Sequence, residues 1–192
     1  MNHGGRRQAA PSFFGMAMLR ALLLSLILSA GLLAQDTVIV LLRHAEKAHK
    51  GDTAELSEAG HRRAAGLPPQ LAAYRPSALF ASNLPRTQQT LAPLSKALGL
   101  PVQIYVRGEE RALARRLLAL HGGERVVVCG HSDTLGTLIE ALGHLEPFPE
   151  VSGYDRFWVL RIREGTASVT LEEHRQAPVG GHPPPPAPVR AR

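Results

Sequence analysis

The stretch from Val38 to Lys47 constrains this chain more than any other, because an apolar run ends there abruptly in charged side chains. Val38 to Leu42 is rich in β-branched and leucine residues, which predicts a buried strand. Arg43 and His44 follow at its carboxyl end, where open α/β sheets bind their ligands. Such a pair suits an anion, since the guanidinium can hold two oxygens while the imidazole attacks or moves a proton. By itself, the stretch is either a ligand site or a solvated charged turn.

The same strand-then-helix pattern recurs along the chain and predicts a single α/β domain. At 192 residues the chain can bury one substantial core but is too short for two domains of ordinary size. Further strands are expected at residues 78–82, 102–106 and 125–129, and helices at 57–64, 86–98, 108–120 and 135–142. Repeated units of this kind give a three-layer α/β/α sandwich with a mainly parallel sheet.

Two details of this fold are expected from turn-forming residues. Pro68 and Pro69 must interrupt the helix that Ser57 caps, so either the helix ends near Gly66 or a second segment restarts at Pro69. Near the C-terminus, strands at 157–162 and 167–171 flank a Glu-Gly turn at 164–165, which predicts an antiparallel hairpin at one edge of the sheet.

Both ends of the chain differ in composition from the domain between residues 35 and 175. Residues 21–34 form an uncharged run after Arg20, typical of a secretory signal, so we expect an exported protein, periplasmic or extracellular. Fourteen residues are short for a membrane span, although an uncleaved N-terminal anchor is the alternative. Residues 176–192 are rich in Gly and Pro, which predicts a disordered tail.

The net charge of +6 argues little for a nucleic-acid partner. Five of the 22 basic residues lie in the two ends, which leaves 17 basic against 16 acidic residues in the body. The body is nearly neutral, and no basic stripe marks a folded face. The single cysteine, Cys129, ends an apolar strand, so we expect a buried, inert thiol and no intramolecular disulfide.

Four scattered residues should meet at one edge of the sheet, because Arg43, His44, Arg86 and His131 each follow a parallel strand. Two guanidinium groups and two imidazoles suit a phosphoryl group. The arginines neutralise and orient it, one neutral imidazole attacks phosphorus to form a phosphohistidine, and the second donates to the oxygens. The arginines supply the positive charge, so we expect no metal and no cofactor. The other histidines of the domain between residues 35 and 175 share no ligand spacing: His49, His61, His121, His144 and His174.

Three sequence blocks along residues 37–171 resemble those of the histidine phosphatase superfamily, in its phosphoglycerate-mutase-like branch. The blocks are Arg43-His44-Ala45-Glu46, Ser82 with Arg86-Thr87-Gln88-Gln89-Thr90, and Gly130-His131-Ser132. They occur in the family's order, each after a predicted strand. The resemblance implies that His44 is the nucleophile, that Arg43 and Arg86 bind phosphate, and that His131 is the second catalytic histidine.

The proton donor is where the resemblance gives the least guidance, because the insertion that carries it in many members is compressed here. Glu109 is the expected donor, with Glu110 and Asp133 as competitors; the two glutamates also suit a helix start, and Asp133 a helix cap. Lys47 begins the segment that departs from mutase-like members, which argues against mutase activity. Glu46 is expected to orient its neighbours, whereas Tyr154 and Trp158 are expected to pack at an edge strand.

These observations predict a metal-independent phosphatase that hydrolyses phosphomonoesters through a phosphohistidine intermediate. Its substrate would be a phosphorylated small molecule or macromolecule. Two alternatives stay open: a phosphatase of phosphohistidine or of envelope sugar phosphates, and a non-catalytic phosphate-binding module. Nothing in the sequence indicates an oligomeric state.

Overall fold

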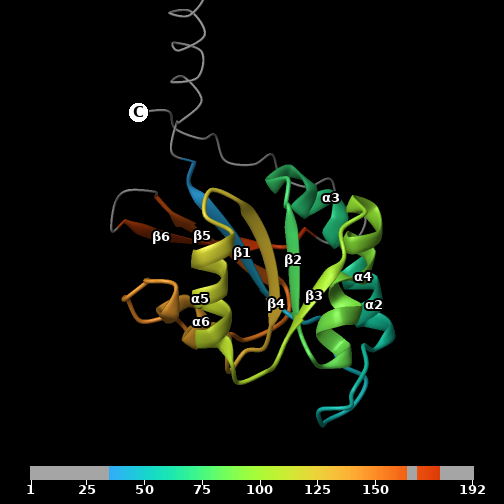
Figure 1. Cartoon of the computed structure of the whole chain (residues 1–192). Coiled ribbons are helices and arrows are strands. Elements are labelled where there is room, and N and C mark those ends of the chain that lie inside the picture. Colours follow the sequence, from blue (N-terminus) through green and yellow to red (C-terminus); the bar gives the residue numbers. More distant parts are fainter. Residues whose placement is uncertain (1–34, 164–167, 178–192) are drawn as a thin grey trace, which may run out of the picture. The chain divides into compact units, whose positions relative to one another are not determined.

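A six-stranded sheet forms the centre of the domain in the computed structural model, which describes residues 35–163 and 168–177 (Figure 1). Its spatial order is β3-β2-β4-β1-β5-β6. The strands are β1 (Thr37–Arg43), β2 (Ala78–Ser82), β3 (Val102–Tyr105), β4 (Arg125–Gly130), β5 (Arg156–Ile162) and β6 (Val169–Arg175). β1 to β4 are parallel, whereas β5 runs antiparallel to β1 and β6 antiparallel to β5. The expected mainly parallel sheet with an antiparallel edge hairpin is confirmed.

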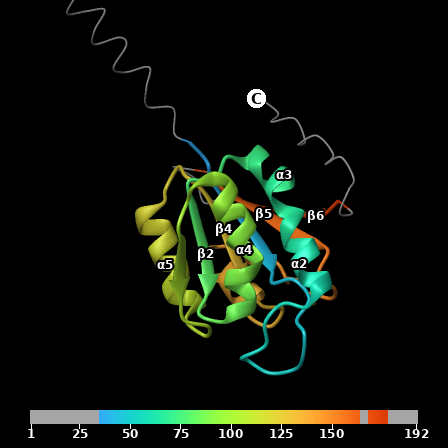
Figure 2. The same ribbon diagram turned by 90° about the vertical axis from the view of Figure 1, so that its right-hand side faces the viewer.

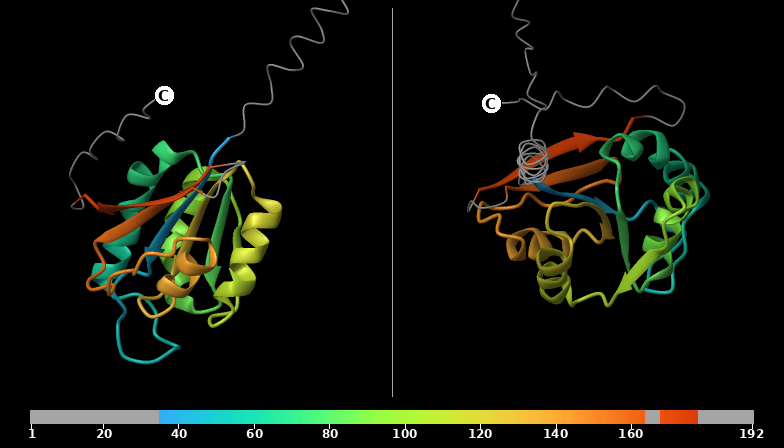
Figure 3. Two further views of the ribbon diagram at one scale, coloured as in Figure 1. Left: turned by 90° about the vertical axis from the view of Figure 1, so that its left-hand side faces the viewer. Right: turned by 45° about the horizontal axis from the view of Figure 1, so that its top comes forward.

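Helices cover both faces of the sheet and complete the three expected layers (Figure 2). One face carries α5 (Glu110–Leu120) and α6 (Leu135–Ala141). The other carries α2 (Glu58–Ala65), α3 (Leu67–Leu71) with the short 3-10 helix Ala72–Tyr74, and α4 (Pro85–Leu98). Seen from the edge that β6 forms, the two helix layers lie on opposite sides of the strands (Figure 3).

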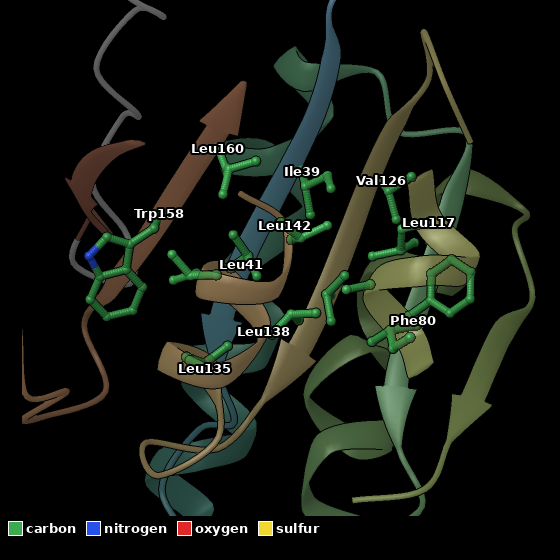
Figure 4. Close-up of a cluster of buried hydrophobic side chains, with 14 of the residues drawn as sticks. Ile39, Leu41, Phe80, Leu117, Val126, Leu135, Leu138, Leu142, Trp158 and Leu160 are labelled. Atoms are coloured by element: carbon green, nitrogen blue, oxygen red, sulfur yellow. The ribbon is translucent and has the colours of Figure 1, made fainter. Parts of the chain in front are cut away.

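The central strand β1 is buried on both faces, as its unbroken apolar sequence predicts. Ile39 and Leu41 point toward α5 and α6, where they join Trp158 and Leu160 of β5 (Figure 4). Val38, Val40 and Leu42 point to the opposite face and pack with α3 and α4. Successive side chains of a strand point to opposite faces of the sheet, so this one apolar run supplies residues to both cores. The same alternation fixes the face to which the Arg43 side chain points.

The break at Pro68 and Pro69 combines the two alternatives considered from the sequence. α2 begins after Ser57, whose Oγ accepts a hydrogen bond from the Gly60 backbone N–H at 3.1 Å, and it ends at Ala65. α3 restarts at Leu67, so both prolines lie in its first turn, where no intrahelical N–H is needed.

Strand ends differ from the predicted ones by a few residues. β3 stops at Tyr105, and β6 runs four residues past Leu171 because it pairs with the whole length of β5, from Ile162 opposite Val169 to Arg156 opposite Arg175. Strand length in a hairpin is therefore set by the partner strand. The Glu-Gly turn at 164–165 lies outside the described residues.

The predicted signal segment (1–34) and most of the predicted tail (178–192) also lie outside the described residues. Gln176 and Ala177 are described, and both are held by the domain. The Gln176 backbone N–H donates to Asp155 O at 2.7 Å, and that of Ala177 donates to Gln70 Oε1 at 2.7 Å. Within the residues that the structure describes, no helix combines the length and apolar character needed to cross a membrane.

Candidate active site

The two predicted catalytic histidines meet at the carboxyl ends of β1 and β4. Arg43 pairs with Gly130 in the last register position of these strands, and the His44 backbone N–H donates to Gly130 O at 3.0 Å. The next residue after Gly130 is His131, so the strand register brings the two rings to a centroid separation of 5.3 Å. Both side chains are buried, with 3% of His44 and 2% of His131 exposed.

The hydrogen bonds of His44 determine which ring nitrogen can attack. His44 Nδ1 lies 2.7 Å from Ala45 O, and a carbonyl oxygen only accepts, so the proton is on Nδ1. Nε2 therefore carries the free lone pair. The segment is held in turn by α4, because the Ala45 backbone N–H donates to Thr90 Oγ1 at 3.0 Å and Thr90 donates to Arg86 O at 2.7 Å.

The surroundings of His44 keep its ring neutral. Burial lowers the pKa of His44 to about 4; the hydrogen bond to Ala45 opposes this shift, whereas the positive charges of Arg86, Arg43 and Lys47 add to it. A neutral imidazole at physiological pH retains the lone pair that a nucleophile needs.

A chain of hydroxyl groups orients His131. Its Nδ1 lies 3.5 Å from Arg86 Nη2, which only donates, so Nδ1 is the acceptor and the proton is on Nε2. Nε2 donates to Ser82 Oγ at 2.8 Å. Ser82 is 2.9 Å from Thr87 Oγ1, and Thr87 donates to Leu84 O at 2.7 Å. Each hydroxyl thus accepts one hydrogen bond and donates the next. The His131 ring is held with the lone pair of Nδ1 toward Arg86.

His131 is also neutral before an anion binds. Burial lowers its pKa to about 3, with further contributions from Arg86, His44 and Arg107. To donate from Nδ1 to an oxygen of a bound anion, the ring must first gain a proton or shift its tautomer. A dianion placed between the two arginines favours the protonated ring.

Each predicted phosphate-binding arginine has a buried donor without an acceptor in the described part of the chain. Arg86 opens α4 with only 4% of its surface exposed, and Arg43 is anchored by Nη1 donating to Gly153 O at 3.0 Å. Arg43 Nε and Arg86 Nε are both buried and unpaired among the described residues. Since a buried unpaired donor costs free energy, two of them beside two histidines mark a place for an anion.

The three carboxylates considered as proton donors lie in different environments. Glu109 is exposed at the N-cap of α5, whereas Glu110 is only 3% exposed and accepts from the Gly108 backbone N–H at 3.2 Å. Asp133 pairs with Arg107 at 2.5 Å. Partial burial opposes its ionisation, but its own backbone amide and Arg107 hold its pKa below the ordinary value. In the described part of the chain, none of the three pairs with Arg43 or Arg86.

Comparison with known proteins agrees with this geometry. Residues 39–114 match the family model described as histidine phosphatase superfamily (branch 1). The matched residues contain Arg43, His44 and Arg86, and His131 lies beyond them. Among curated protein sequences none matches significantly.

Solved structures of several phosphatases share the fold. The protein histidine phosphatase SixA, complexed with tungstate, is 20% identical, with a TM-score of 0.61 over 72% of this chain and 97% of that one. An Agrobacterium tumefaciens protein provisionally assigned as phosphohistidine phosphatase SixA is 25% identical, with a TM-score of 0.51 over 73% and 98%. The mycobacterial glucosyl-3-phosphoglycerate phosphatase is 17% identical, with a TM-score of 0.58 over 72% and 97%.

Tyr154 is a residue of the candidate site that the sequence did not indicate. We expected it to pack at an edge strand, but it lies in the loop before β5, with its ring 4.2 Å from Arg43 Cζ and 5.8 Å from the His44 ring. Its hydroxyl accepts from Arg43 Nη2 at 3.4 Å. No sequence spacing marks it, because the contact arises only when β5 lies beside β1. Trp158 is 2% exposed and packs against Phe148.

Glu46 braces the segment after His44, in line with the orienting role expected for it. Its carboxylate accepts from Arg63 Nε at 2.9 and 3.0 Å and from Nη2 at 2.6 Å. Although burial opposes ionisation, the Arg63 hydrogen bonds hold the pKa of Glu46 below its usual value. The ion pair ties the catalytic segment to α2.

Cys129 is buried in β4, as predicted, and burial raises the pKa of its thiol.

Among residues 35–163 and 168–177, no group of three or more His, Cys, Asp or Glu side chains could hold a metal ion.

Proposed function

We propose that this chain is a phosphatase that hydrolyses phosphomonoesters through a phosphohistidine intermediate on His44. The observation that carries the proposal is the His44 ring itself, buried and neutral with its proton on Nδ1. The ring lies 5.3 Å from that of His131, which Arg86 contacts, and Arg43 and Arg86 each keep a buried Nε donor unpaired among the described residues. An electrophile that carries negative oxygens, such as phosphorus in a phosphate ester, uses every one of these features.

The chemistry proceeds in two displacements at phosphorus. Arg43 and Arg86 bind the phosphoryl oxygens and offset their charge, which otherwise repels a nucleophile. His44 Nε2 attacks, the bond from phosphorus to the leaving oxygen breaks, and Ala45 O stabilises the charge that develops on the ring through Nδ1–H. Water then attacks phosphorus, the P–N bond breaks, and phosphate leaves.

A second candidate substrate is phosphohistidine in a protein. One similar structure is named a protein histidine phosphatase, and another, 25% identical to this chain, is provisionally named a phosphohistidine phosphatase. Because another similar structure is a glucosyl-3-phosphoglycerate phosphatase, a sugar phosphate is also a candidate substrate of this chain. Phosphorus bonded to nitrogen or to a sugar oxygen is attacked in the same way by His44.

The proposal is tested by incubating the purified chain with an aryl phosphate, a sugar phosphate and a phosphohistidine peptide. We expect release of inorganic phosphate, and after rapid denaturation a phosphoryl group on His44 that is labile to acid. Binding of vanadate without turnover of any of these substrates would support the non-catalytic phosphate-binding module instead.

We expect kcat/KM to stay high as the pH falls from 7 to 5, after correction for substrate ionisation, and to decrease as the pH passes through about 4. Protonation removes the attacking lone pair, so activity is lost on the acid side of the His44 pKa. A profile of kcat/KM against pH measures this. An acid limb near the ordinary histidine value of about 6.5 would contradict the buried, neutral state of His44.

Folding stability must be followed over the same pH range. The pKa values of His44 and His131 are lower in the folded state than in the unfolded chain, so between about 6.5 and 4 the unfolded chain binds more protons. Stability from these rings is present above pH 6.5 and is lost as the pH falls toward 4. A thermal unfolding curve at each pH separates loss of fold from loss of the nucleophile.

A further inference from the structure

We propose that Asp52, in the loop between β1 and α2, is the catalytic acid that protonates the leaving group. The inference rests on the proposed phosphatase function and supplies the proton donor that it lacks. Asp52 was not among the site residues expected from the sequence. The loop lies beyond the carboxyl end of β1, the strand that His44 follows directly (Figures 1 and 2).

The backbone of this loop is anchored on a phosphate-binding arginine. Lys47 and Leu56 pair at the base of the loop, and the Ala48 N–H donates to Glu55 O at 2.9 Å. At its tip, Arg86 Nη1 donates to Gly51 O at 3.2 Å and to Asp52 O at 3.0 Å. The position of Asp52 is therefore tied to the guanidinium that receives the substrate.

The Asp52 side chain and the His131 ring both contact the guanidinium group of Arg86. Asp52 Oδ1 lies 3.4 Å from Arg86 Nη2, and that nitrogen lies 3.5 Å from His131 Nδ1. The carboxylate oxygen is thus within about 7 Å of the His131 ring, the sum of these two contacts. A phosphoryl group bound between the arginines and histidines leaves its ester oxygen within reach of this carboxyl group.

Other carboxylates near the site have partners that hold them away from this role. Glu46 is bound by Arg63 through both oxygens, and Asp133 is paired with Arg107. Glu110 is buried against the Gly108 amide. Within the described residues, Asp52 is the carboxylate that forms an ion pair with one of the two phosphate-binding arginines.

Exposure lets Asp52 exchange its proton with water. Its side chain is 69% exposed, whereas that of Arg86 is 5% exposed.

The proton balance closes over one turnover. As His44 Nε2 bonds to phosphorus, the bond to the leaving oxygen breaks and that oxygen takes the proton from the Asp52 carboxyl group. The alcohol leaves, and Asp52 remains as a carboxylate. The carboxylate then removes a proton from water as the water oxygen attacks phosphorus and the P–N bond breaks, which restores protonated Asp52 and neutral His44.

The test compares two leaving groups in Asp52→Asn. We expect kcat/KM for an alkyl phosphate, whose leaving group needs a proton, to fall by roughly 10²- to 10³-fold. For p-nitrophenyl phosphate, whose leaving group departs as a stable anion, the loss should stay within about 10-fold. Asp52→Glu, which keeps a carboxyl group, should restore part of the alkyl phosphate activity.

Glu55→Gln is the matched control, since it removes one negative charge from an exposed position of the same loop. It should leave both activities near the wild-type values. Equal losses for both substrates in Asp52→Asn would overturn the proposal and make Asp52 a residue that only positions Arg86, and an undiminished alkyl phosphate activity would overturn it as well. Failure of the wild-type protein to hydrolyse either ester would instead contradict the proposed function.

Discussion

Replacement of His44 by alanine should reduce phosphate release to background, a loss on the order of 10⁴-fold or more. His131 is also a neutral imidazole, but its Nε2 is bound to Ser82 and its Nδ1 lone pair accepts from Arg86, so it does not replace His44. The arginines remain, so vanadate should still bind. Steady-state turnover of an aryl phosphate and vanadate titration measure the two effects separately.

His61→Ala is the control for this substitution, because His61 is an exposed histidine on α2. It should retain wild-type turnover and the phosphoenzyme seen after rapid denaturation. His44→Ala should yield no phosphoenzyme while unfolding at a temperature close to that of the wild type. Labelling or turnover that persists in His44→Ala would end the assignment of His44 as the nucleophile.

Gly60→Ala should cause the largest loss of stability among single-methyl additions, about 3 kcal/mol. A Cβ at Gly60 would lie 2.2 Å from Glu46 O and 3.1 Å from two further backbone atoms of Glu46. Since these are backbone atoms, no side-chain rotation relieves the clash. Either α2 or the segment after His44 must move, and activity should decrease along with stability.

Thermal unfolding measures this effect, with an expected decrease in Tm on the order of 10 °C. Gly122→Ala provides the matched control, because a Cβ there meets nothing within 4 Å and the backbone has no positive φ. That variant should unfold at or slightly above the wild-type temperature. A Gly60→Ala protein as stable as Gly122→Ala would show that α2 does not pack closely on the catalytic segment.

The fold was predictable from sequence because its signals are local. The unbroken apolar run in β1 indicates a strand buried on both faces, and Ser57 marks the start of α2 through its hydrogen bond to Gly60. Strand ends were less predictable. β6 extends to Arg175 because β5 offers partners along its whole length, which is a property of the pair.

Within the site, the meeting of Arg43, His44, Arg86 and His131 followed from their positions after parallel strands, since all such ends share one edge of a sheet. The contacts among these residues did not follow. Ser82 and Thr87 appeared in the sequence as members of a motif, but only the structure shows that their hydroxyls carry the hydrogen bond that orients His131.

By itself, the sequence determined the fold class, the family resemblance and which four side chains would meet at one edge of the sheet, because residue type and the order of strands and helices can be read from local sequence. Only the tertiary structure decided which nitrogen of each histidine is free, that Tyr154 stacks on Arg43, and that Asp52 contacts Arg86. These features depend on hydrogen bonds and packing between segments far apart in the chain. No periodicity or spacing encodes them, since they arise when β5 lies beside β1 and the loop after β1 folds over α4.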